Sequence, residues 1–460
     1  MPYYAAPADA VPQALSRTRL LRFSAMAVPI YAAAQPVMAF VPAILARHYG
    51  MSLATLGVLF LVGQVVNSLL DPVIGTLSDR TVSRFGRRRP WIAGGGLLFI
   101  AGCTMLFFPP PGWVSVTWVS VAVLLYYTGA AATTTALLAW SGEISGDYHE
   151  RTRIASLFTF LSAAALVLTL LLPAVADQIR PDDGPLRLTL FGTLVLATAI
   201  PGLWLTLTAL PDRSAAPHEQ GPFDLKATLR AIFANPLLLR VLASDTAVTA
   251  GQGVRTALLL FVITIYFGKP EWAAGMFLFQ YSFGILAGPI WQRIGTRLGK
   301  SRAAVLAELV QAAINFGLVF LTPDRFGLML ALAFLQGLSQ GSGNLFLRSM
   351  VADIADHHRA NTGEDRVGLY YSVFSVSQKL GGAIAVGAAL PLVSAFGFDP
   401  RGVVNTPEAL RALILVFALG PALAHTFAAL LVAGFPLDSR AHAEVRRKLA
   451  YDPPRLVPAE

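Results

Sequence analysis

Long apolar stretches alternate with short polar segments along almost the whole chain. Twelve of the apolar stretches have about 20 residues or more, the length that a helix needs to cross the hydrocarbon core of a bilayer. The pattern therefore predicts an all-α membrane protein with twelve transmembrane helices. These are expected at residues 20–45, 54–77, 91–109, 113–140, 154–177, 188–210, 238–267, 272–292, 303–322, 327–350, 369–395 and 409–435.

The longest polar segment, residues 211–237, divides the predicted helices into two groups of six. We therefore expect an N-terminal tail at 1–19, a six-helix bundle at 20–210, a linker, a second bundle at 238–435 and a C-terminal tail at 436–460. The tails and the linker are expected on the cytoplasmic side, because basic residues gather in every second loop and cationic loops are retained in the cytoplasm. The expected location is the plasma membrane, which is the inner membrane if the source is bacterial.

Composition agrees with the membrane class. The chain is 55% hydrophobic and only 13% charged, with a mean hydropathy of +0.60, whereas soluble domains are about 25% charged. The net charge of +9 would favour nucleic acid as the partner of a soluble protein. Here the cations lie mainly in loops and the C-terminal tail, so membrane lipid is the expected partner and nucleic acid is not. The single cysteine, Cys103, excludes an internal disulfide.

A short repeat relates the two halves. Six glycine and basic positions after the second predicted helix recur 213 residues later, after the eighth. Such parallel repeats are typical of transporters that hold their substrate between two pseudo-symmetric bundles; chance similarity of two basic loops is the alternative. The first copy is Gly75, Arg80, Arg84, Gly86, Arg87 and Arg89, and the second is Gly288, Arg293, Arg297, Gly299, Lys300 and Arg302.

Three motifs carry a resemblance to a known family. The pattern D-P-x-x-G-x-x-x-D-R-x-x-x-x-x-G-R at 71–87, GEISGDYHERTRI at 142–154 and VADIADHHRANTG at 351–363 resemble the glycoside–pentoside–hexuronide:cation symporters of the major facilitator superfamily. The run RFGRRRPWI at 84–92 is also similar to the related sucrose carriers. The resemblance implies a major facilitator fold and cation-coupled import of a small solute. It implies no cofactor beyond the coupling ion, H⁺ or Na⁺.

Several positions depart from the family pattern. Melibiose-type members have two acids on helix two, but here Asn67 and Leu70 leave Asp71 as the only acid. The family's sugar-binding acid on helix four and arginine on helix five match Thr134 and Thr159. Because much of the sugar-binding set is replaced, a simple neutral galactoside is not the expected substrate.

Helix two provides the predicted coupling site. Gln64, Asn67 and Asp71 are spaced at i, i+3 and i+7 and so share one helix face. A charge inside a membrane is costly and marks a functional site by default, so Asp71, with Asn67, is predicted to bind the coupling cation. Sodium needs several oxygen ligands and Leu70 offers none, which favours a proton. A structural hydrogen-bond cluster between helices is the alternative.

Two basic residues inside predicted helices could answer this charge. Lys379 matches the family's helix-eleven lysine, which the resemblance implies lies close to the helix-two carboxylate. Arg255 lies near the middle of its helix and could hold an acidic group of the substrate in a bidentate manner. It could equally pair with Asp245 or Asp71 and play only a structural part. Gln64, Thr134 and Trp140 complete the predicted substrate contacts, with an interfacial aromatic belt as the alternative for Trp140.

The repeated basic loop is expected to act as a conformational latch that pairs with acids on neighbouring helix ends. Its predicted members are Asp79, Arg80, Arg84, Arg87, Arg88, Glu143, Arg293 and Arg297. The run GLSQG at 337–341 fits a hydrolase motif, G-x-S-x-G, but it lies inside a predicted membrane span, where small residues favour close helix packing. No enzyme activity is therefore expected.

The sequence as a whole predicts a symporter that works as a monomer on a small-molecule substrate. A sugar, glycoside or related polar solute is the first expectation. The same fold carrying an anionic or amphiphilic solute, such as a uronide or lysolipid, is the alternative, and a non-transporting membrane receptor is a further one. No phosphate-binding loop is present, so ATP is not expected as the energy source.

Overall fold

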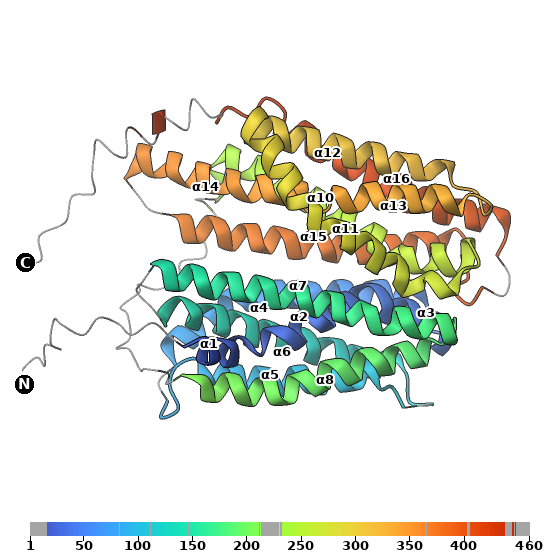
Figure 1. Ribbon diagram of the computed structural model, residues 1–460, viewed down its shortest axis with the longest axis horizontal. Helices are drawn as coiled ribbons and strands as arrows, with labels where there is room; N and C mark the ends of the chain where they lie inside the picture. Colours follow the sequence, from blue (N-terminus) through green and yellow to red (C-terminus); the bar gives the residue numbers. More distant parts are fainter. Residues whose placement is uncertain are drawn as a thin grey trace, which may run out of the picture.

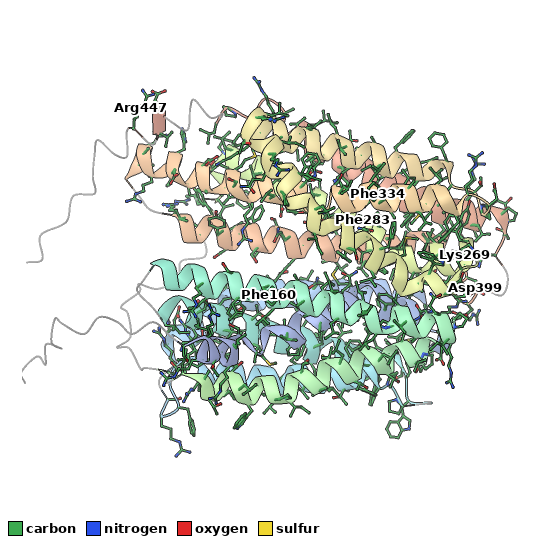
Figure 2. The ribbon with its side chains drawn as sticks, in the orientation of Figure 1. Phe160, Lys269, Phe283, Phe334, Asp399 and Arg447 are labelled. Atoms are coloured by element: carbon green, nitrogen blue, oxygen red, sulfur yellow. The ribbon has the colours of Figure 1, made fainter. Side chains whose placement is uncertain are left out.

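The computed structural model describes residues 16–81, 83–110, 112–144, 148–210, 212, 230, 232–363, 366–402, 405–437, 444–445 and 447. In this part of the chain the regular structure is helical throughout. The helices form two layers that lie side by side, one from each half of the chain (Figure 1). The described chain begins at α1 (Arg17–Ser24) and ends at Arg447, and these described termini lie at the same end of the molecule (Figures 1 and 2). The predicted all-α fold with two bundles is confirmed.

Both halves consist of long helices joined by short turns. The N-terminal half contains α1 (Arg17–Ser24), α2 (Ala27–Gln35), the π-helical turn η1 (Pro36–Phe40), α3 (Val41–Tyr49), α4 (Leu53–Arg80), α5 (Arg89–Phe107), α6 (Val116–Glu143), α7 (Tyr148–Ile179) and α8 (Gly184–Ala209). The C-terminal half contains α10 (Pro236–Phe261), η2 (Val262–Tyr266), η3 (Pro270–Trp272), α11 (Ala273–Leu298), α12 (Lys300–Gly317), η4 (Leu318–Phe320), α13 (Phe326–Leu338), α14 (Ser342–Thr362), α15 (Val367–Ala395) and α16 (Pro407–Val432).

Side-chain caps fix where several helices begin. The hydroxyls of Ser52, Ser115 and Thr406 each accept a bond from the backbone N–H three residues later, which satisfies a donor that has no partner within the helix. Asp183 and Asn235 do the same at α8 and α10, in each case followed by a proline suited to the first turn. These caps explain why membrane-length helices begin so soon after short polar turns.

The tenth predicted span, 327–350, is not one continuous helix. It is divided into α13 and α14 at Ser339–Gly341, where Gly341 adopts a left-handed backbone with φ of 68°. The carbonyls at the break are satisfied by side chains: Trp291 donates to Leu338 O at 2.9 Å and Gln311 to Ser339 O at 2.8 Å. Eleven other helical segments in the described residues are long and apolar enough to span a membrane unbroken.

Two helix pairs, α4 with α15 and α7 with α11, form most of the seam between the halves. Helices α4 and α15 run antiparallel. Small residues let these helices approach closely, since a Cβ added to Gly57 would meet Pro391 at 2.7 Å and one added to Gly387 would meet Leu61 at 2.9 Å. Phe40 of η1 and Phe277 of α11 close the interface further, with ring centroids 5.1 Å apart. Apolar contacts thus hold the bundles together at the end opposite the termini.

A polar clasp also joins the bundles at that end. Asp177 and Arg187, which are almost fully buried, form an ion pair at 2.6 Å within the N-terminal half. Each of them also bonds across the interface: Asp177 accepts from the N–H of Ala274 at 3.0 Å, and Arg187 donates to the carbonyl of Pro270 at 3.1 Å. Figure 2 shows the loop residues Lys269 and Asp399 at this end and Arg447 at the end that carries the termini.

Candidate functional site

An ion pair across the seam lies at the centre of the candidate site. The carboxylate of Asp71 on α4 pairs with the ammonium of Lys379 on α15, so the two halves of the molecule each contribute one charge. Lys379 also donates to the side-chain oxygen of Asn67 at 3.2 Å, and the amide of Asn67 donates to Gln64 at 3.1 Å. The stripe predicted on helix two is therefore one connected hydrogen-bond network.

The pair is partly accessible. The side chains of Asp71 and Lys379 are 23% and 25% exposed, whereas Asn67, one turn away toward the end opposite the termini, is buried. Ser372 and Ser375 share the face of α15 that carries Lys379 and lie nearer the termini, and both are exposed. The pair is thus not sealed within the protein, and the exposed serines lie on its side nearer the termini.

The neighbouring helix α6 contributes Thr135 rather than Thr134. The hydroxyl of Thr135 donates to the second oxygen of Asp71 at 3.2 Å, and no bond from the Thr134 side chain is recorded in the described part of the chain. Adjacent residues on a helix point about 100° apart, so Thr135 and Thr134 face different neighbours, and Thr135 is the one bonded to Asp71. The prediction named Thr134 because the family pattern was aligned by sequence alone. The side chain of Thr159 lies outside the described residues.

Arg255 forms a second polar site in the C-terminal bundle. It is 6% exposed and donates to the side-chain oxygen of Gln280 on α11. Neither proposed structural partner contacts it. Asp245 instead accepts from Asn344 at 3.0 Å and from Ser377 at 2.9 Å, while Asp71 pairs with Lys379. Among the described residues, no carboxylate lies within ion-pair distance of Arg255.

The described contacts of Trp140 are with α1 and with the start of α5. Its ring is 3% exposed and packs edge-on against Phe23 at 5.1 Å between centroids, with the guanidinium of Arg89 at 5.9 Å from its centroid. The predicted stacking of Trp140 on a substrate ring therefore has no support in this conformation. The contacts of Trp140 with Phe23 and Arg89 indicate a structural role beside the basic loop.

Two of the predicted latch residues, Asp79 and Arg88, contact each other in the N-terminal half. Arg88, 3% exposed, pairs with Asp79 and donates to the hydroxyl of Ser78 at 2.5 Å. The carboxylate of Asp212 accepts from the N–H groups of Arg88 and Arg89 at 2.7 and 3.0 Å. Sequence reasoning missed Asp212, because it belongs to the linker. Its position directly after six predicted helices was the only available signal.

The other predicted latch residues have different surroundings. Arg80 and Arg84 are exposed, and Arg84 lies over the ring of Phe85 at 4.7 Å. Arg293 and Arg297 are also exposed, and the ion pair recorded in that loop is instead Lys300 with Asp353, at 2.7 Å. The side chain of Glu143 lies outside the described residues.

A buried acid–histidine pair lies deeper in the C-terminal bundle. Glu308 on α12 and His425 on α16 are 2.6 Å apart and essentially unexposed. Gln311, on the same face of α12 as Glu308, accepts from Gln336 at 2.5 Å. These contacts join α12 to α13 and α16, so they fix the packing of that bundle.

Comparison with known proteins identifies the family. The family model described as "MFS/sugar transport protein" matches residues 23–439, nearly the whole chain. The chain belongs to this family. Major facilitator members are transporters rather than enzymes, and the fold, the motifs and this match agree on that class.

Individual relatives are distant but match along most of their length. The putative glycoside/cation symporter YagG of Escherichia coli is 24% identical over 88% of this chain and 88% of its own. The isoprimeverose transporter of Lactiplantibacillus pentosus is 22% identical over 85% and 82% of the two chains. Among solved structures, the xylose transporter XylE from E. coli superposes with a TM-score of 0.62 at 14% identity, over 93% of this chain and 98% of that one. The structural likeness establishes the fold.

Proposed function

We propose that this protein is a secondary active symporter that imports a sugar, a glycoside or a related polar organic solute, driven by a cation gradient. Its relatives include named glycoside and isoprimeverose transporters, which supports this solute class. The observation that carries the coupling mechanism is the ion pair between Asp71 and Lys379, which joins the two bundles and is partly exposed. Intramembrane acid–base pairs of this kind mark ion pathways in transporters.

The coupling step uses groups already in contact. When Asp71 takes up a proton, its carboxylate becomes neutral and the attraction to Lys379 is lost. The ammonium then keeps Asn67 as a partner, or it turns to the substrate. Because the pair links α4 to α15, its loss loosens the seam and permits the bundles to rock about the site, as alternating access requires. Loss of the proton on the opposite side restores the pair.

A proton suits the described geometry better than Na⁺. The oxygen atoms near Asp71 come from Asn67 and Thr135, and both are already engaged with Lys379 and Asp71. The ammonium of Lys379 already occupies the position next to the Asp71 carboxylate where a metal ion would bind. H⁺ is therefore the proposed coupling ion.

The orientation and the assembly belong to the same proposal. Both termini, the linker and the basic loops lie in the cytoplasm, so the described conformation faces inward. The apolar seam contacts and the Asp177–Arg187 clasp close its outer side. The protein acts as a monomer in the plasma membrane. The pairs Asp79–Arg88 and Lys300–Asp353 position the basic loops to close the cytoplasmic side when the outer side opens.

Transport by the pure protein tests the proposal. The protein is reconstituted in lipid vesicles and given a panel of radiolabelled sugars and glycosides under an imposed pH gradient or, separately, an imposed Na⁺ gradient. Accumulation of a panel member that requires the pH gradient supports proton symport. Accumulation that follows the Na⁺ gradient would replace the ion. No uptake or counterflow of any solute would favour a receptor.

A further inference from the structure

Arg255 is a buried cation without an anionic partner in the described residues. A charge removed from water costs several kcal/mol unless an opposite charge compensates it. Asp245, on the same helix, lies ten residues earlier, which corresponds to about 15 Å along the helix axis, and its oxygens are held by Asn344 and Ser377. Within the part of the chain that the structure describes, the guanidinium of Arg255 is therefore a buried positive charge without a compensating carboxylate.

The surroundings of Arg255 are polar and amide-rich. A cavity of about 20 Å³ adjoins it, with room for about one water molecule. Its polar lining comes from α10, α11 and the region of the α13–α14 break, and consists of Gln252, Arg255, Thr256, Gln280, Tyr281, Gln336 and Gln340. Amide groups can donate and accept at once, as sugar hydroxyls do, so this lining suits a hydroxylated solute.

Hydrogen-bonding capacity at this cavity is left over. The side-chain oxygen of Gln336, a residue 3% exposed, is buried and has no partner. Tyr281 reaches across the interface to the oxygen of Gln35 at 3.2 Å, and the amide nitrogen of Gln35 is likewise buried without a partner. Buried polar groups are normally satisfied. An unused acceptor in the lining of this cavity, beside a guanidinium that has no anionic partner among the described residues, indicates that a ligand completes the site.

The cavity is located where a carried solute could reach it. Tyr281 and Phe277 both line it and both contact the N-terminal bundle, through Gln35 and Phe40. Figure 2 shows Phe283, one turn after Gln280, near the middle of the C-terminal layer, in contact with Phe334. Gln340 belongs to the break between α13 and α14, and interrupted helices are typical of substrate sites in transporters.

We propose that Arg255 binds the carboxylate of the transported solute, so that the substrate is an acidic sugar or an acidic glycoside rather than a neutral one. This inference rests on the proposed transport function and specifies its substrate class. The carboxylate takes the place of the Gln280 oxygen on the guanidinium, in the two-point geometry that arginine favours. Gln280, released from Arg255, enlarges the cavity, and Gln336 and Gln35 then bond the hydroxyl groups.

Matched ligand pairs test the substrate class directly. The melting temperature of the detergent-purified protein is measured at pH 7 with D-glucuronate against D-glucose and with D-galacturonate against D-galactose. Their methyl glycosides extend the comparison. A ligand that binds only the folded state raises the melting temperature, and at a fixed ligand concentration the rise is larger for the ligand with the lower Kd. We expect the acidic member of at least one pair to bind ten-fold or more tightly than its neutral counterpart.

Three variants assign any preference to the cavity. Arg255→Gln is expected to abolish the preference for the acidic member. Gln280→Glu supplies a carboxylate to Arg255 from within the protein, so it should raise the melting temperature without ligand and also abolish the preference. Arg240→Gln removes an equal charge from the same helix, where Arg240 donates to the carbonyls of Leu431 and Ala433, and should leave the preference intact.

The outcomes that overturn the inference are distinct from those that overturn transport. Equal binding of acidic and neutral members, or a preference that survives Arg255→Gln, contradicts the inference while proton-driven uptake of a neutral sugar would preserve the transport proposal. Inorganic phosphate forms a separate arm, because stabilisation by phosphate equal to that by glucuronate would mean that the site takes a free anion and not a sugar acid. Absence of any uptake in vesicles would instead reject the transport function.

Discussion

Asp71 and Lys379 form an ion pair that joins α4 of one bundle to α15 of the other. The exposed Ser372 and Ser375 lie on the same face of α15 as Lys379, nearer the end that carries the termini, and Asn67 is buried on the other side of the pair. The charges therefore lie where the closed part of the seam meets the accessible part. A change in their charge state acts directly on the contact between the bundles.

Thr135 should matter more than its neighbour Thr134, because its hydroxyl donates to Asp71. Thr135→Val keeps the shape of the side chain and removes a bond worth about 0.5–1.5 kcal/mol. We expect proton-driven uptake at pH 7 to fall roughly two- to ten-fold, as that range of energies implies. Thr134→Val is the matched control and should leave the uptake rate within experimental scatter. A larger loss of uptake in Thr134→Val than in Thr135→Val would contradict the assignment of Thr135 to the site.

Removing one member of the central pair should cost more stability than removing both. Lys379→Met leaves the Asp71 carboxylate without its partner, and the pair is neither fully exposed nor fully buried, so we expect a loss of about 1–3 kcal/mol. The double variant Asp71→Asn, Lys379→Met should recover most of that loss. Denaturation of the parent, the two single variants and the double variant in one detergent gives the free energies of unfolding for a double-mutant cycle. If the two single-variant losses add up to the loss in the double variant, the contact contributes nothing to stability.

The clasp at the opposite end predicts a conformational effect. Asp177→Asn weakens the ion pair with Arg187 and the bond to the Ala274 N–H, so the end opposite the termini should open more often. The readout is labelling of Ala274→Cys, a fully buried position, by an impermeant maleimide in a Cys103→Ala background. We expect labelling to rise several-fold. Asp183→Asn, which removes an equal charge at the α8 cap, should not raise it.

The contacts of Arg88 lead us to expect that the basic loop helps to close the end of the molecule that carries the termini. Arg88→Gln removes a buried charge that pairs with Asp79 and bonds Ser78, and should lower stability by about 1–3 kcal/mol. If the loop is a latch, Ser375→Cys should remain labelled in this variant under conditions that protect it in the parent. Arg84→Gln, at an exposed position, should change stability by less than about 0.5 kcal/mol. Normal protection of Ser375→Cys in Arg88→Gln would contradict the latch.

The sequence predicts this fold well because the membrane imposes strong constraints. Apolar length alone locates the spans, since backbone groups in lipid must be satisfied within a helix. The approach of Asp71 to Lys379 follows from the same physics together with the family resemblance, because charges inside a membrane need partners. The basic repeat in the sequence likewise indicates two related halves.

Finer features depend on rotation and contact that sequence patterns do not encode. A difference of one position separates Thr134 from Thr135, and helix periodicity cannot resolve which faces Asp71 without the packing of α6 against α4. The break at Gly341 lies in an apolar run that also fits a continuous helix, and only the bonds from Trp291 and Gln311 show how it is stabilised. Arg255 had two plausible acid partners, and the structure gives it Gln280 instead.

The most direct measurement of the central claim uses the Asp71→Asn variant in vesicles. Accumulation driven by a pH gradient and counterflow of labelled solute without a gradient are compared with those of the parent protein at equal incorporation. The account predicts that accumulation is lost while counterflow persists, because the variant cannot exchange a proton at this site but still rocks between its two states. Undiminished proton-driven accumulation in Asp71→Asn would contradict it.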